Sequence, residues 1–184
     1  MFKKFDDVTS ALHMMQRMTK LQSQHNQLRT DLEELIAVTE VRMETHVKND
    51  AFIRSCISEL FTLIESDVLY INLIDPAENY DDWNVFIDRF KDVFKAHCIN
   101  HKYENIYNNF ASKNLSDFKH LRAKRNKITH PKEKTDTEVN KQLFQKMKKV
   151  FTAYSRFVVD IMTGTGVEFS IASMSEFTNA IQNR

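Results

Sequence analysis

Apolar residues recur along most of the chain at the spacing of an α-helix. Within residues 5–47 they alternate at steps of four and three, at Met14, Met18, Leu21, Leu28, Leu32 and Leu35. His25 and Thr39 occupy the remaining positions of this stripe, which is a heptad pattern of about four repeats. The pattern predicts one long helix or two. The stripe would pack either into the chain's own bundle or against a second chain as a coiled coil.

The next segment predicts a core helix followed by a loop. Residues 50–74 carry a broad apolar face, and the polar sequence DPAENYDD at 75–82 is typical of a loop. Asp81 and Asp82 suit the first turn of the helix after it, because carboxylates are favoured at a helix N-terminus. The buried stripe of that helix is expected to begin at Trp83.

Three more helical elements are expected in the second half of the chain. A short one covers residues 102–111, and Asn114 is a candidate cap for the helix that follows. Thr135 and Glu138 form a T-x-x-E capping box for a last core helix, which the TGTG sequence at 163–166 ends.

Composition supports helices throughout. The chain has only two glycines and two prolines in 184 residues, so few residues interrupt a helix. We therefore predict an all-α fold with three parts: a long helical extension over 1–49, a bundle of four to five helices over 50–163, and a tail over 164–184 with one short helix.

The location expected from the sequence is the cytoplasm. Cys56 and Cys98 are too few for a disulfide or metal framework and are interpreted as reduced thiols. The sequence contains no N-terminal apolar leader and no apolar run of membrane-spanning length, so no membrane association is expected.

The near-neutral total charge hides a basic block. Residues 50–113 hold six cations and eleven anions, whereas residues 114–149 hold eleven cations and four anions. A block of this kind suits a polyanion, although an acidic neighbour within the fold would explain it as well.

Within the basic block, an arginine lies on an apolar stripe. Arg125 occupies the position between Leu121 and Ile128, where a cation costs free energy unless it is paired or reaches a cavity. Glu65, at the edge of an apolar stripe, is the candidate partner for Arg125. Pro131 directs the preceding residue, His130, out of the helix, and the negative helix end favours its imidazolium.

The segment Arg125-Asn126-Lys127-Ile128-Thr129-His130 resembles the R-x4–6-H motif of HEPN domains, which lies late in a helical bundle. The resemblance implies a HEPN-like bundle and a metal-independent ribonuclease, without cofactor, whose active site forms where two copies of the motif meet in a homodimer. Many such domains belong to toxin–antitoxin, abortive-infection or phage-defence systems, which implies an antitoxin or regulatory protein as a partner. Some members carry a tyrosine two residues after the histidine that a nucleotidyltransferase modifies; Lys132 stands there, so that regulation is not implied.

The chemistry that follows assigns three catalytic residues. His130 would act as general base or acid, Arg125 would stabilise charge on the phosphate, and Asn126 would orient either group. Cations would hold the RNA backbone at single-stranded or loop regions, namely Arg122, Lys124, Lys127 and Lys132.

Other functions stay open at this point. The basic segment would equally suit a catalytically inactive module that binds RNA or protein, or a solvated helix end capped by His130. A helical scaffold that acts through its heptad region is a third alternative. His97 and His101 have the i, i+4 spacing of a metal-binding face, but no third ligand stands near them in the sequence, so no metal is expected.

Overall fold

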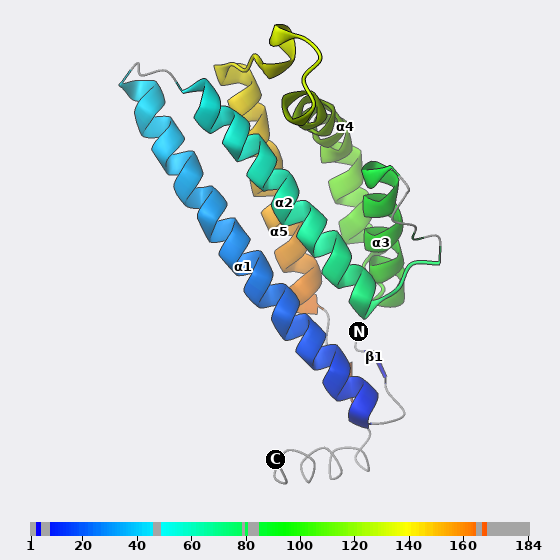
Figure 1. The fold of residues 1–184 in the computed structure, drawn as a ribbon. Helices are drawn as coiled ribbons and strands as arrows, with labels where there is room; N and C mark the ends of the chain where they lie inside the picture. The colour runs from blue at the N-terminus through cyan, green and yellow to red at the C-terminus, as the bar shows by residue number, and fades with distance from the viewer. Residues whose placement is uncertain are drawn as a thin grey trace.

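The structure, a computed structural model, describes residues 3–4, 8–45, 49–78, 80, 85–164 and 167–168 (Figure 1). Its helices are α1 (Val8–Glu44), α2 (Asp50–Ile74), α3 (Phe86–Asn100), α4 (Glu104–Thr129), the 3-10 helix η1 (Lys134–Thr137) and α5 (Lys141–Gly164). Two short strands, β1 (Lys3–Lys4) and β2 (Val167–Glu168), pair in parallel. The all-α prediction is confirmed. No helix in the described ranges is long and apolar enough to cross a membrane.

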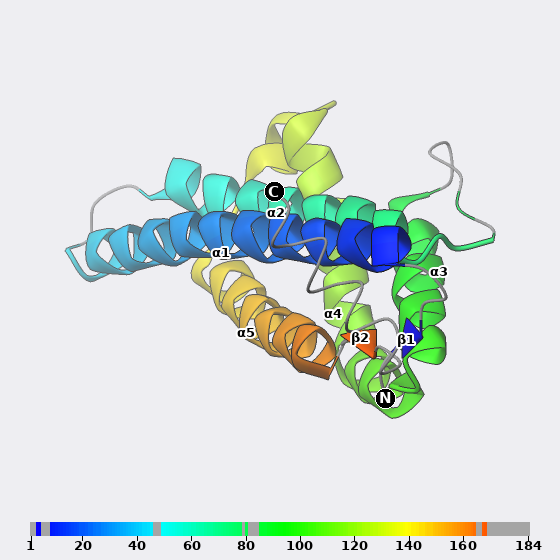
Figure 2. The same ribbon diagram turned by 90° about the horizontal axis from the view of Figure 1, so that it is seen from below.

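The five α-helices enclose one core. Helix α1 lies antiparallel along α2 over most of its length, and Figure 2 shows the same two helices side by side from below. Helix α4 packs along α5, and α3 packs against both α2 and α4. Aromatic rings fill the centre, among them Phe61, Phe90, Phe94, Phe118 and Tyr154. Residues of α1 belong to the same core as those of the other helices.

The apolar stripe of α1 faces α2 within the same chain. Buried positions alternate along α1 at Met14, Leu21, His25, Leu32, Ile36 and Thr39. Of the two arrangements that the heptad pattern left open, the structure therefore has the stripe in the chain's own bundle.

The polar residues of the stripe find partners in neighbouring helices. The Oγ1 of Thr39 donates to the carbonyl of Leu35 at 2.7 Å and lies 3.4 Å from the Sγ of Cys56 on α2. His25 Nδ1 lies 2.8 Å from Asp67 Oδ2, and the hydroxyl of Tyr154 on α5 donates to the same oxygen at 2.7 Å. This buried group joins α1, α2 and α5.

Two of the predicted helix starts are wrong. Asn114 lies inside α4, where its Nδ2 donates to the carbonyl of Phe110 at 3.2 Å, so residues 102–111 and the helix after them form one helix. Thr135 lies in η1 and not at the start of α5, because Asp136 closes a turn there. The residue that caps α5 is Asn140, whose Oδ1 accepts the N–H of Leu143 at 2.9 Å.

Other predicted features fall outside the described residues. Helix α3 begins at Phe86, and Asp81, Asp82 and Trp83, expected at its start, are not described. The short helix expected within the tail 164–184 also lies outside the described part of the chain.

Candidate active site

Helix α4 ends directly before the predicted catalytic histidine. Its last residue is Thr129, and His130 follows with φ −127° and ψ 65°, outside the α conformation. The N–H of His130 still donates to the carbonyl of Asn126 at 2.9 Å, so the backbone of the histidine stays attached to the last turn. Pro131 disfavours a helical conformation at the preceding residue, which is the physical reason for the end at this position. The side chain of His130 is exposed.

Asp136 holds the segment after His130 in place. Its Oδ2 accepts the backbone N–H groups of Lys132 at 3.0 Å and Glu133 at 3.2 Å, and its Oδ1 lies 3.3 Å from the Nζ of Lys127 on α4. These backbone hydrogen bonds, the one from Lys132 first, lower the pKa of the Asp136 carboxyl. Because Lys124 Nζ also donates to the carbonyl of Asp136 at 3.0 Å, the turn is tied back to α4 at two positions.

A depression of about 650 Å³ lies between the end of α4 and this turn. Its walls contain all three predicted catalytic residues and three of the four predicted RNA-binding cations: Arg122, Arg125, Asn126, Lys127, His130, Lys132, Glu133 and Asp136. Lys124 is not part of the wall. Four cations face two carboxylates in this depression, which gives it a positive formal charge.

Glu65 on α2 pairs with two arginines of α4. Its Oε2 lies 3.6 Å from the Nη2 of Arg125, the partner expected from the sequence, and its Oε1 lies 3.1 Å from the Nη1 of Arg122. One carboxylate thus fixes two guanidinium groups at one wall of the depression. Because each carboxylate oxygen faces a different guanidinium, this shared ion pair limits how the two arginine heads are oriented.

Arg122 is held more firmly than Arg125. Its guanidinium carbon lies 4.6 Å from the ring centroid of Phe86 and 5.5 Å from that of Phe61. Burial lowers the pKa of Arg122, while Glu65 opposes this shift. The contacts make Arg122 part of the packing beneath the depression.

The structure also forms a cluster of which the sequence indicated only His97 and His101. Asp75 Oδ2 lies 2.7 Å from His97 Nδ1 and 2.9 Å from His101 Nε2, and all three side chains are buried. The third residue, Asp75, stands 22 residues before His97 at the end of α2, so it was not recognised as a neighbour of the histidines. A carboxylate that directly follows an apolar helix was the available signal. Glu65 and Asp75 are separated by ten residues, about 15 Å along a helix, so this cluster is distinct from the depression.

Comparison with known proteins leaves the site to be interpreted from its own chemistry. No protein-family model, no curated protein and no solved structure matches this chain.

Proposed function

We propose that the chain is a metal-independent endoribonuclease of the HEPN type that acts as a homodimer. The observation that carries the proposal is a positively charged depression that contains Arg125, Asn126 and His130 together. A general acid–base group, a guanidinium and an amide on one wall are the groups that cleavage of a phosphodiester by its own 2′-hydroxyl requires.

The reaction needs two proton transfers and charge stabilisation at phosphorus. A neutral His130 accepts the proton of the 2′-hydroxyl as the 2′-oxygen attacks phosphorus, and the bond from phosphorus to the 5′-oxygen breaks. A protonated imidazole gives its proton to that leaving oxygen. The products are a 2′,3′-cyclic phosphate and a 5′-hydroxyl, with no water or metal consumed. Arg125 stabilises the negative charge that builds up on the non-bridging oxygens.

Two copies of the chain are part of the proposal because one depression supplies one histidine. His130 is exposed at a helix end, where a second chain can approach it. In a dimer the two imidazoles divide the base and acid roles. A shared site also doubles the cations available to the RNA backbone, which no single chain provides.

Substrate and partners follow from the same chemistry. Lys127, Lys132 and the two arginines contact phosphates and not bases, so we infer weak sequence preference and steep dependence on salt. Unpaired loops and single strands are the RNA regions in which a phosphodiester is most accessible. An enzyme of this kind suits a cytoplasmic toxin or phage-defence effector, restrained by an antitoxin or another regulatory protein.

The test compares His130→Ala with His120→Ala, a matched change at an exposed histidine of α4 that lies outside the depression. The substrate is a labelled single-stranded RNA, and the product ends are identified by mass spectrometry. We expect His130→Ala to lower the cleavage rate by about 10²–10⁴-fold, the usual contribution of a general acid or base, and His120→Ala to leave it unchanged. Cleavage that survives in His130→Ala, or that requires added divalent metal, excludes the proposal.

One observation favours a second candidate, a catalytically inactive module that binds RNA or protein through this surface. Glu65 pairs with Arg122 and Arg125, and Asp136 pairs with Lys127, so three of the cations already have a carboxylate partner. Wild-type protein that binds RNA in a salt-dependent manner, measured by fluorescence anisotropy, yet yields no product from any strand, supports the module over the enzyme.

A further inference from the structure

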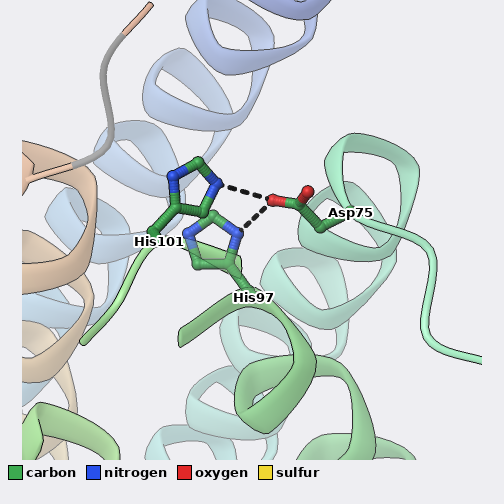
Figure 3. Close-up of side chains that lie close together, drawn as sticks. All are labelled: Asp75, His97 and His101. Atoms are coloured by element: carbon green, nitrogen blue, oxygen red, sulfur yellow. Dashed lines mark hydrogen bonds and ion pairs between the residues drawn. The ribbon is translucent and has the colours of Figure 1, made fainter. Parts of the chain in front are cut away.

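Three buried side chains converge at the end of the bundle opposite the depression. Asp75 follows the last residue of α2, His97 lies in the last turn of α3, and His101 follows the end of α3. Figure 3 shows both imidazole rings directed at the same carboxylate oxygen of Asp75. The ring centroids of the two histidines are 4.6 Å apart, and the three ligand atoms all lie within 4.8 Å of one another.

The electrostatic surroundings of this cluster favour a cation. The side chain of Asp75 is completely buried, and its Oδ1 accepts a hydrogen bond from Asn100 Nδ2 at 3.3 Å. The C-terminal ends of α2 and α3 meet at the same place, and each adds negative partial charge. A buried carboxylate beside two negative helix ends is costly unless positive charge compensates it.

We propose that Asp75, His97 and His101 form a binding site for a divalent transition-metal ion, with zinc as the best match. Two imidazole nitrogens and one carboxylate oxygen are a donor set that zinc accepts in proteins, where a water completes the fourth position. Tetrahedral bonds of about 2.0–2.1 Å would place neighbouring ligand atoms about 3.3 Å apart. The present distances of 2.7 Å and 2.9 Å need an expansion of about half an ångström to accept the ion.

Binding of the ion exchanges hydrogen bonds for metal bonds without a net loss of protons. In the structure Asp75 can accept N–H groups from both rings. A metal ion needs the lone pairs of those two nitrogens, so each ring proton moves to its other nitrogen and both rings stay neutral. Within the described residues His101 Nδ1 has no hydrogen-bond partner, so no donor there prevents this nitrogen from carrying the proton.

The role of such an ion would be structural. Its three ligands come from the ends of two helices, so it would join α2 to α3 at the point where the chain turns between them. The ligands are buried, and Asp75 lies ten residues beyond Glu65, about 15 Å along a helix, so the ion would take no part in cleavage at the depression. The metal-site proposal can therefore be tested independently of the nuclease proposal.

The test uses the untagged full chain after dialysis against EDTA. Zinc is added and quantified by elemental analysis after gel filtration, and thermal unfolding is followed with and without it. A parallel sample receives Co²⁺, whose visible absorption reports tetrahedral coordination by nitrogen and oxygen. Variants Asp75→Asn and His101→Gln remove one ligand each. His25→Gln is the matched control, because it alters a buried histidine that also contacts an aspartate.

We expect one zinc ion per wild-type chain and a rise in the unfolding midpoint of about 5–10 °C when zinc exceeds its dissociation constant 100-fold. Asp75→Asn and His101→Gln should weaken binding by more than about 100-fold, since even residues that only orient metal ligands contribute 10–100-fold. His25→Gln should keep the zinc.

The proposal is overturned if wild-type protein retains no zinc and its unfolding midpoint does not respond. It is also overturned if His101→Gln binds as much zinc as the wild type, because the metal would then lie elsewhere. Should a ligand variant fail to fold, the Co²⁺ spectrum of the wild type decides, and a spectrum without visible absorption excludes the site.

Discussion

Replacement of Tyr154 by phenylalanine removes one hydroxyl group at the junction of three helices. That hydroxyl donates to Asp67 Oδ2 at 2.7 Å, and His25 Nδ1 lies 2.8 Å from the same oxygen. Tyr154 and Asp67 are both fully buried. The aromatic ring is retained in the variant, so its contacts with Phe94 and Phe157 persist and no large cavity forms.

The expected cost follows from the loss of one donor to a buried carboxyl group. A hydrogen bond to a charged group contributes about 1.5–3 kcal/mol to stability. For a chain of this length, 1 kcal/mol corresponds to about 2–4 °C in the unfolding midpoint. We therefore expect Tyr154→Phe to lower the midpoint by about 3–12 °C.

The size of this loss should depend on pH in a defined direction. Burial raises the pKa of Asp67 in the folded protein, and the bonds from His25 and Tyr154 oppose the shift. Because the pKa of Asp67 is raised in the folded protein, the free energy of unfolding decreases as the pH rises through that pKa. It increases again when the carboxyl group takes up a proton at lower pH. The hydroxyl of Tyr154 favours the ionised form, so the penalty of the variant is largest above the folded pKa of Asp67 and smaller below it.

The assay is urea unfolding followed by circular dichroism at neutral pH and again in acid. Tyr70→Phe, which changes a half-buried tyrosine of α2, is the matched control and should alter stability by less than about 0.5 kcal/mol. An unchanged midpoint in Tyr154→Phe, or a penalty that grows as the pH falls, would refute this account of the buried group.

Three further predictions concern other parts of the fold. Hydrogen bonds from Lys149 and, to a smaller extent, Lys146 on α5 lower the pKa of Asp117 in the folded protein. The Asp117 carboxylate therefore stabilises the fold above its unfolded-state pKa, and this stabilisation is lost as the pH falls through its folded-state pKa. Asp117→Asn should therefore cost about 0.2–1 kcal/mol in thermal unfolding at neutral pH and almost nothing near pH 2, and an equal cost at both would contradict the pairing. Burial raises the pKa of both cysteine thiols, that of Cys98 to about 12, so neither Cys56 nor Cys98 should react with a thiol reagent at pH 8 until urea unfolds the chain; fast labelling of the native protein would disprove this. Asn140→Ala removes the cap of α5 and should lower the free energy of unfolding by about 1 kcal/mol in urea, while Asn140→Asp should retain it.

The sequence predicts the first two helices well because their periodicity is long. The division of α4 at Asn114 is wrong because asparagine occurs both at helix caps and within helices. Only the hydrogen bond from Asn114 to the carbonyl of Phe110 shows that it lies within the helix. The end of α4 at His130 is predicted correctly because proline imposes a local restriction that needs no tertiary contact.

In the two candidate sites, too, some features follow from the local sequence and others depend on tertiary contacts. Arg125 and Asn126 lie in the last turns of α4, and His130 directly follows its end, five residues after Arg125, so their proximity follows from the sequence alone. The path of the turn after His130 does not, and for this reason the sequence does not predict that Lys124 donates to the carbonyl of Asp136. Asp75 meets His97 and His101 only because α2 packs on α3, a contact that no local pattern encodes.

The position of α1 against α2 decides how its contribution can be studied. A shortened protein that starts at Asp50 would leave the apolar face of α2 in water and Asp67 without His25. The phenotype of such a truncated protein would reflect misfolding and aggregation, and not a separate function of α1. Substitutions on its outward side, at Val38 and Val41, leave the packing intact and are the informative changes there.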